Sequence, residues 1–382
     1  MSGDSTQDRA MSAQSSDAGI FSVSAAMNFF SWLICEHPRA WQAIGNFESR
    51  LLQDEIETTA VRRPIWVTGL ARSGSTLLLE KLAAVPGVVS QTYKDFPPVY
   101  TPYAWNRLIE HMGSGNAQPA ERAHKDGIMV TLDSPEAMEE PLWMSFFPDA
   151  HNPAVSNVIP AGSAPDFAAF FANHIRKFLA VRNGERYLAK ANYQVTRLEY
   201  LLDLYPDACF VIPVRDPATH IASLIKQHRL FSRGQAANAR ARAHLRRVGH
   251  FEFGLDRSPI NTGDTSATER VQSLWCDGAE VEGWAVYWAQ IYGYVADRLE
   301  RNPALANATK VVSYEQLCSQ PAEELSALFR HCELEVSDGF VAGAAGDIAA
   351  PTYYRPDFSS AELDTIREIT TPARERLAAC CR

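Results

Sequence analysis

One segment constrains the fold of this chain more than any other: a short apolar run, then a glycine-containing turn, then a helical pattern. The run is Ile65–Gly69, the turn contains Arg72 and Gly74, and the helix begins with Ser75 and Thr76. Glycines let a backbone turn tightly, and the first amides of the following helix then point their N–H groups at an anion. The segment therefore predicts a strand, a loop that binds an anion, and a helix.

The loop resembles a nucleotide phosphate-binding loop with one change. Its glycines have the spacing G-x-x-x-x-G, but Ser75 stands where such a loop needs lysine, and Arg72 supplies the positive charge. A loop of this kind suits a terminal phosphate or sulfate that needs no metal, and it suits a magnesium nucleotide poorly. A strand-to-helix turn without a ligand is the alternative. The preceding strand, the following helix and the arginine favour anion binding.

Three more apolar runs predict strands of the same sheet: Tyr187–Lys190, Ala208–Val214 and Lys310–Ser313. Each is bounded by turn residues and followed by a helical pattern. Such alternation is typical of an α/β fold, with a parallel sheet covered by helices on both faces. Two insertions, at about 96–160 and 229–277, interrupt the alternation. We expect them to form a cap over the ligand site.

Residues 19–382 are therefore expected to form a single domain with these two cap insertions. The first 18 residues are rich in Ser, Asp, Gln and Ala, which predicts a disordered leader. The apolar segment Ile20–Cys35 is interrupted by polar residues, so it predicts a buried or capping helix, with a membrane-surface helix as the less favoured alternative.

Composition limits the partners. The 36 Lys and Arg residues against 45 Asp and Glu residues give a net charge of −9, which argues against a nucleic-acid partner. We expect no integral membrane association, and an oligomer is possible. The seven cysteines are scattered without a metal-binding pattern, so we expect reduced thiols, a cytoplasmic location and no metal.

A second strand, turn and helix carries another cation. Arg215 leaves the run Ala208–Val214, Pro217 suits the first turn of a helix, and Ser223 lies about two turns further on. Arg215 can bind a phosphate bidentately, and Ser223 adds a hydroxyl donor. An arginine at a strand end is more often a salt-bridge partner, so this motif alone does not identify a site.

Together the two motifs resemble those of the sulfotransferases that use 3′-phosphoadenosine 5′-phosphosulfate (PAPS), and Val311–Leu317 resembles a further segment of that family. The segments at 121–124 and 133–140 look like a bacterial branch. The resemblance implies a P-loop-like fold and sulfuryl transfer from PAPS to a hydroxyl or amine of a small-molecule, carbohydrate or lipid-like acceptor. It also implies the cofactor-binding residues, which are Arg72, Ser73, Gly74, Ser75, Thr76 and Leu77 for the 5′-phosphosulfate and Arg215 and Ser223 for the 3′-phosphate.

Three residues are candidates for the chemistry. In the cytosolic branch of the family a Lys-x-His sequence supplies a stabilising lysine and the base; here Lys190 matches the lysine, but Asn192 replaces the histidine. The base must then come from an insertion. Asp95 is one candidate, with capping of a turn as its alternative. His124 is the other, with a surface helix position as its alternative.

Several other patterns have structural interpretations. Asp133, Ser134 and Pro135 predict a helix start, with Glu136 in its first turn; Glu140 could instead contact the acceptor. The aromatic residues of 284–292 recur at helical spacing and predict core. A basic run at 229–247 predicts a solvated helix face, although it could close over the donor or an anionic acceptor.

Two other functions compete with sulfuryl transfer. A small-molecule kinase or other phosphotransferase would need a phosphate lysine and a magnesium-binding acid, and neither stands at its expected place. A non-catalytic nucleotide-binding protein is the second alternative, because the histidine of the Lys-x-His sequence is absent.

Overall fold

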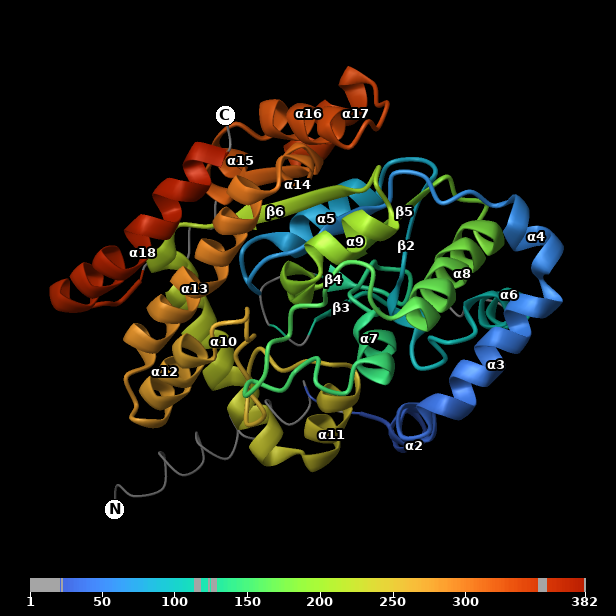
Figure 1. Ribbon diagram of the computed structural model, residues 1–382, viewed down its shortest axis with the longest axis horizontal. Coiled ribbons are helices and arrows are strands. Elements are labelled where there is room, and N and C mark those ends of the chain that lie inside the picture. Colours follow the sequence, from blue (N-terminus) through green and yellow to red (C-terminus); the bar gives the residue numbers. More distant parts are fainter. Residues whose placement is uncertain are drawn as a thin grey trace, which may run out of the picture.

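The centre of the molecule is a five-stranded parallel sheet with the strand order β2-β5-β1-β6-β7 (Figure 1). The computed structural model describes residue 21 and residues 23–112, 118–122, 124, 129–349 and 356–380, so the predicted leader lies outside the described residues. The strands are β1 Ile65–Val67, β2 Val88–Ser90, β5 Arg186–Lys190, β6 Cys209–Val214 and β7 Thr309–Ser313. The four predicted strands are confirmed, and β2 adds a fifth after the helix that follows the glycine loop.

Alternate residues of the central strand β1 face opposite sides of the sheet, and both sides are buried. Trp66 belongs to one hydrophobic cluster, which is packed by helices α8 (Pro165–Val181) and α13 (Glu280–Arg301). Ile65 and Val67 belong to the other, packed by α5 (Ser75–Ala83) and α16 (Pro321–His331). Because a strand has a side-chain period of two, a continuous apolar run is what burial on both faces requires. The predicted α/β fold, with helices on both faces of a P-loop-like parallel sheet, is confirmed.

The remaining elements surround this core (Figure 1). A two-stranded antiparallel hairpin is formed by β3 (Ala120–Glu121) and β4 (Met129–Val130). The other helices are α2 Ala25–Cys35, α3 Pro38–Leu51, α4 Gln53–Thr58, η1 Tyr93–Asp95, α6 Pro102–Met112, α7 Glu140–Phe146, η2 Asn192–Thr196, α9 Leu198–Leu204, α10 Pro217–Ala237, α11 Ala239–Arg247, α12 Thr265–Cys276, α14 Pro303–Ala308, α15 Tyr314–Ser319, α17 Asp338–Gly346 and α18 Ser360–Cys380.

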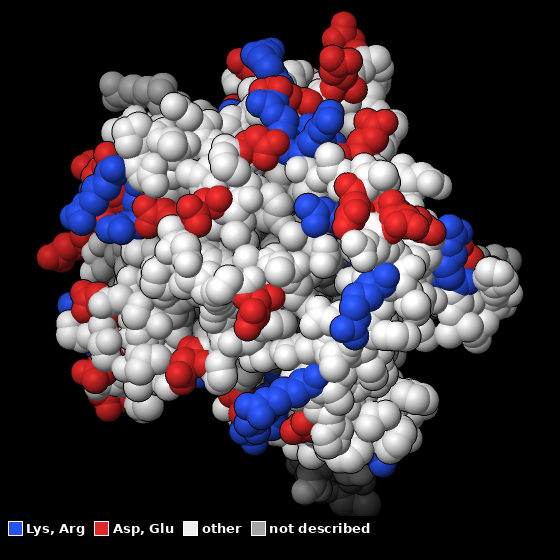
Figure 2. All heavy atoms as spheres, turned by 45° about the vertical axis from the view of Figure 1, so that its right-hand side comes forward, with Lys and Arg blue, Asp and Glu red and all other residues white. Residues whose placement is uncertain are grey.

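Helix α13 carries the aromatic residues that the sequence assigned to the core. Their side chains are buried: Trp284, Tyr287, Trp288 and Tyr292. Helix α18 packs along α13 on the left of Figure 1. The core prediction for this stripe is confirmed. On the face drawn in Figure 2, acidic and basic side chains are interspersed, as expected from the similar totals of the two charge types.

The N-terminal helix α2 lies at the surface. The helix is confirmed, but its aromatic side chains are not buried: Phe29 and Phe30 are 53% and 52% exposed, whereas Ile34 is buried. Its residue Met27 contributes to the wall of the main pocket, so α2 caps that pocket from one side. Among the described helices, none combines the length and the apolar composition needed to cross a bilayer.

The helix start expected at Asp133 is wrong. The chain turns at 132–134, where the amide of Ser134 donates to the carbonyl of Thr131, and it then pairs with a distant segment: Pro135 forms a bridge with Thr92, and the amide of Glu136 donates to the carbonyl of Gln91 at 2.9 Å. These long-range hydrogen bonds compete with the first helical turn. The helix α7 therefore begins only at Glu140.

Candidate active site

The glycine loop connects β1 to α5 and has the geometry expected of an anion cradle. Its backbone is left-handed at Arg72 (φ 71°) and at Gly74 (φ 105°). Gly74 caps α5 without any side-chain cap, so no capping side chain takes up the first amides of the helix. A Cβ on Gly74 would lie 2.7 Å from a ring carbon of Tyr314, so glycine is required by space as well as by conformation.

The second predicted motif meets the first. Nε of Arg72 donates to Oγ of Ser223 at 3.3 Å, although 151 positions separate them. Arg215 donates to the carbonyl of Arg72 at 3.4 Å, and its guanidinium lies 5.0 Å from the ring centre of Tyr314. The structure thus brings Arg72, Arg215 and Ser223 to one place beside the helix amides.

Arg215 also shows that this place suits an anion. Its Nε is buried and has no hydrogen-bond partner among the described residues. A buried guanidinium N–H without a partner is costly, and a bound phosphate would satisfy it. The turn that carries Arg215 is fixed by Glu315, which accepts a hydrogen bond from the amide of Asp216 at 2.9 Å.

A buried histidine, which the sequence analysis did not identify, hydrogen-bonds to the backbone of the glycine loop. His220 hydrogen-bonds through Nε2 to the carbonyl of Ala71 at 2.8 Å, and Trp288 donates its indole N–H to the other ring nitrogen at 3.2 Å. Burial lowers the pKa of His220 to about 3. The neutral ring, with its proton on Nε2, therefore fits both contacts.

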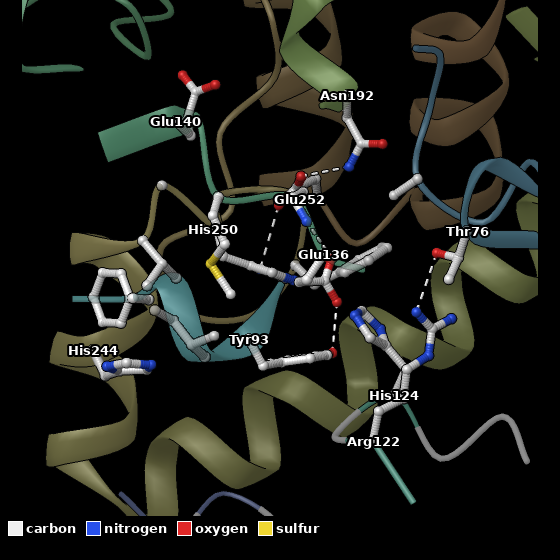
Figure 3. Close-up of a pocket in the computed structure, with 18 of the residues that line it drawn as sticks. Thr76, Tyr93, Arg122, His124, Glu136, Glu140, Asn192, His244, His250 and Glu252 are labelled. Carbon is white, nitrogen blue, oxygen red and sulfur yellow. Dashed lines mark hydrogen bonds and ion pairs between the residues drawn. The ribbon is translucent and has the colours of Figure 1, made fainter. Parts of the chain in front are cut away.

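Next to the loop lies a pocket of about 590 Å³ that both insertions help to line (Figure 3). Arg72, Ser75 and Thr76 reach it from the loop, and Lys190 reaches it from the end of β5. Most of the remaining wall is apolar. That wall includes Phe21, Val23, Met27, Phe96, Met138, Phe231, Leu245, Val248 and Phe253.

Lys190 is largely buried and lies in the pocket, as expected. Its Nζ is 3.4 Å from Oε1 of Glu136, and the hydroxyl of Tyr93 donates to the other oxygen at 2.5 Å (Figure 3). Burial opposes the charge of Glu136, but Lys190 and Tyr93 outweigh it and lower the pKa of the carboxyl to about 2. Glu136 is thus an ionised partner that holds the lysine in place.

Arg122 connects the first insertion to the phosphate helix. Its guanidinium donates to Oγ1 of Thr76 at 3.1 Å (Figure 3). The sequence analysis did not predict that Arg122 contacts the phosphate helix or that Glu136 pairs with Lys190. The acidic residues near Glu136 were the one available signal, and they were interpreted as charges in the first turn of a helix.

Asp95 has the capping role that was the alternative to catalysis. Its carboxylate accepts hydrogen bonds from the amide and hydroxyl of Thr92, at 2.7 and 2.9 Å, which closes a capping box on η1. The same carboxylate pairs with Arg182 at 2.6 Å and is almost fully buried. Its neighbours Tyr93 and Phe96 line the pocket, and Asp95 does not.

His124, the other predicted base, does line the pocket. Its Nδ1 lies 3.2 Å from the amide oxygen of Gln227, and its ring centre is 5.8 Å from that of His250. Glu140 also borders the pocket, but Arg197 binds both its oxygens, at 2.6 and 2.9 Å. Burial and this arginine, with the arginine prevailing, lower the pKa of Glu140 to about 2.

The basic run is partly structural. Arg242 binds both oxygens of Asp256, each at 2.7 Å, and Arg247 donates to the side chain of Asn28 at 3.0 Å. These contacts join α11 to the loop that follows it and to α2. Within the described residues, no cluster of three or more His, Cys, Asp or Glu side chains is placed to hold a metal ion.

Comparisons with known proteins agree with these motifs. The model of the family described as "Sulfotransferase family" matches residues 64–257, just over half of the chain. The comparison with curated proteins found no match.

The similar solved structures include three bacterial sulfotransferases. The sulfotransferase STF1 of Mycobacterium tuberculosis has 17% identity, with 86% of this chain and 81% of that chain covered and a TM-score of 0.45. The sulfotransferase STF9 of Mycobacterium avium has 15% identity, coverage of 86% and 80%, and a TM-score of 0.49. A sulfotransferase of Alicyclobacillus acidocaldarius has 13% identity, coverage of 84% and 96%, and a TM-score of 0.40. With its family model matched over the loop, the second motif, the first insertion and part of the second, the chain belongs to the sulfotransferase family.

Proposed function

We propose that this protein transfers the sulfuryl group of PAPS to a hydroxyl group of a small acceptor by in-line displacement. One observation carries the proposal above the others. The arginine of the glycine loop, Arg72, meets Arg215 and Ser223 of the second motif beside the uncapped amides of α5. A donor with a phosphosulfate at one end and a 3′-phosphate at the other needs two such anion-binding groups in one site.

The donor would use both halves of this site. The amides of α5 and the side chain of Arg72 bind the 5′-phosphosulfate, and Arg215 and Ser223 bind the 3′-phosphate. Ser73, Gly74, Ser75, Thr76 and Leu77 supply the backbone of the cradle. The unsatisfied Nε of Arg215 supports this assignment, because a phosphate oxygen is the partner it lacks.

Lys190 would stabilise the leaving group. As the sulfuryl group departs, negative charge builds on the oxygen that bridges sulfur and phosphorus, and a fixed ammonium nearby lowers the barrier. The loss of one such donor costs about 10²–10³ in rate. Glu136 pairs with the lysine at the pocket wall, and Tyr93 holds Glu136 by a hydrogen bond, so the ammonium is already positioned before the charge develops.

The pocket indicates a compact and mostly apolar acceptor. The volume of about 590 Å³ must hold the reacting end of the donor as well as the acceptor, and its far wall is lined by Phe96, Met138 and Phe231. Burial of apolar surface is worth roughly 25 cal/mol per Å². We propose that the insertions 96–160 and 229–277 form the acceptor side, with the hydroxyl directed toward Lys190.

Calorimetric titration of adenosine 3′,5′-bisphosphate without metal tests this function. We expect submillimolar binding to the wild type, lost in Arg72→Ala and in Arg215→Ala. Arg39→Ala removes an exposed arginine of α3 and is the matched control, for which binding should be unchanged. Failure of the wild type to bind, alongside binding of Mg-ATP, would replace sulfuryl transfer with phosphoryl transfer.

A further inference from the structure

The pocket contains a chain of contacts between a histidine, a glutamate and an asparagine. The function proposed above gives these three residues no role. His250 and Glu252 belong to the second insertion, between α11 and α12, and Asn192 follows Lys190 by two residues. All three line the pocket (Figure 3). Strand β5 ends at Lys190, and η2 begins two residues later at Asn192. Asn192 therefore lies close in sequence to the lysine of the pocket.

Asn192 and Glu252 place a carboxylate beside the histidine. Nδ2 of Asn192 donates to Oε1 of Glu252 at 2.6 Å, and Oε2 of Glu252 lies 3.3 Å from Nδ1 of His250, an ion-pair distance at which neither of these two buried atoms makes a hydrogen bond within the described residues (Figure 3). A carboxylate beside one ring nitrogen favours the tautomer with the proton on that nitrogen, and it stabilises the imidazolium that forms later. Nε2 is then the nitrogen left to accept a proton.

The ring itself is held in place by packing. His250 stacks on Phe231 with a centroid distance of 4.8 Å and an interplanar angle of 7°. The segment between His250 and Glu252 is anchored as well, because the amide of Phe251 donates to the hydroxyl of Tyr193 at 2.9 Å. A ring fixed in this way at the pocket wall loses little conformational entropy at the moment of reaction.

Two other titratable groups nearby already have partners. Glu136 is kept ionised by Lys190 and Tyr93 despite its burial, with its pKa at about 2. Nδ1 of His124 lies 3.2 Å from the amide oxygen of Gln227. Among the described residues, Glu252 and His124 are two titratable side chains that lie against the ring of His250.

We propose that His250 is the general base of the reaction and that Glu252 and Asn192 are its positioning residues; the inference rests on the function proposed above. Nε2 of His250 takes the proton of the acceptor hydroxyl while the hydroxyl oxygen bonds to sulfur. The bond between sulfur and the bridging phosphate oxygen breaks, and its electron pair leaves with adenosine 3′,5′-bisphosphate. The products are a sulfate ester, the bisphosphate and a protonated His250.

The experiment measures release of radiolabelled sulfur from PAPS to naphthol, to octanol and to water, with calorimetric binding of adenosine 3′,5′-bisphosphate in parallel. In His250→Gln we expect turnover to fall about 10²–10⁴-fold, while bisphosphate binding stays within twofold. In Glu252→Gln we expect a loss of at least about tenfold. His111→Gln, at an exposed position of α6, is the matched control and should keep full turnover.

Two further readouts separate catalysis from a structural role. The pH dependence of turnover should differ between the wild type and His250→Gln, because the variant lacks the proposed base. Added imidazole should restore part of the turnover of His250→Ala. Unchanged turnover and pH dependence in His250→Gln would overturn the assignment. A wild type that binds the bisphosphate but transfers label to none of the three acceptors would also overturn it, whereas absent bisphosphate binding would instead overturn the proposed function.

Discussion

Replacement of Gly74 by alanine tests the phosphate loop where it approaches its neighbours most closely. Its φ of 105° costs an L-residue about 1–2 kcal/mol, and a Cβ would lie 2.7 Å from Cδ2 of Tyr314. The ring must therefore move. Because the guanidinium of Arg215 lies 5.0 Å from the centre of that ring, Arg215 must move with it.

Movement of Arg215 should weaken nucleotide binding by an amount that can be measured. A hydrogen bond between a charged group and its partner contributes about 1.5–3 kcal/mol, so the loss of one phosphate contact weakens binding roughly 10–150-fold. We expect this fall in affinity for adenosine 3′,5′-bisphosphate in Gly74→Ala by calorimetric titration. Urea unfolding should show, in addition, a destabilisation of at least about 1 kcal/mol.

Gly278→Ala separates backbone strain from displacement of the ring. Gly278 also has a left-handed backbone, with φ of 78°, but nothing lies within 4 Å of its Cβ position. The variant should lose about 1–2 kcal/mol of stability and keep wild-type affinity for the bisphosphate. If Gly74→Ala binds the bisphosphate as tightly as Gly278→Ala does, the arrangement of Gly74, Tyr314 and Arg215 is not the nucleotide site.

Three more predictions concern Lys190, Asp95 and two buried carboxylates. Lys190→Ala should lower turnover with labelled PAPS about 10²–10³-fold while the bisphosphate still binds, and a loss under threefold would contradict the role of the lysine. Asp95→Asn should destabilise the fold by about 3–5 kcal/mol in urea unfolding, because it breaks the largely buried pair with Arg182; wild-type stability with lost turnover would instead make Asp95 the base. Glu136 and Glu140 have folded-state pKa values of about 2, below their usual 4.5. Each should contribute about 3 kcal/mol above pH 4.5, lost as pH falls toward 2; Glu136→Gln should flatten this acid limb of the unfolding free energy, and an unchanged limb would contradict the pairing with Lys190.

The local parts of the fold could be predicted from the sequence because their determinants are local. A run buried on both faces, a glycine-bearing turn and a helical pattern lie next to each other in 65–83, and the structure confirms them. The second motif is of the same kind, with Asp216 as the N-cap and Pro217 in the first turn of α10. The resemblance to a family then related the two motifs, which no local pattern could do.

The parts that could not be predicted depend on contacts between distant segments. Asp95 looked equally suitable as a base or a cap until Arg182, 87 positions away, was placed beside it. The extended backbone at Pro135 likewise depends on pairing with Thr92. His250 carries no motif, and the role we propose for it follows only from the positions of Glu252 and Asn192.

The central claim is that the donor is PAPS and that its sulfuryl group is what moves. The most direct measurement compares transfer from sulfur-radiolabelled PAPS, without metal, with transfer from ATP labelled on its terminal phosphate, with magnesium. We expect the wild type to transfer radiolabelled sulfur to naphthol, octanol or water, and Arg215→Ala to lose this transfer. Transfer of labelled phosphate from ATP, with no release of sulfur label from PAPS, would contradict the claim.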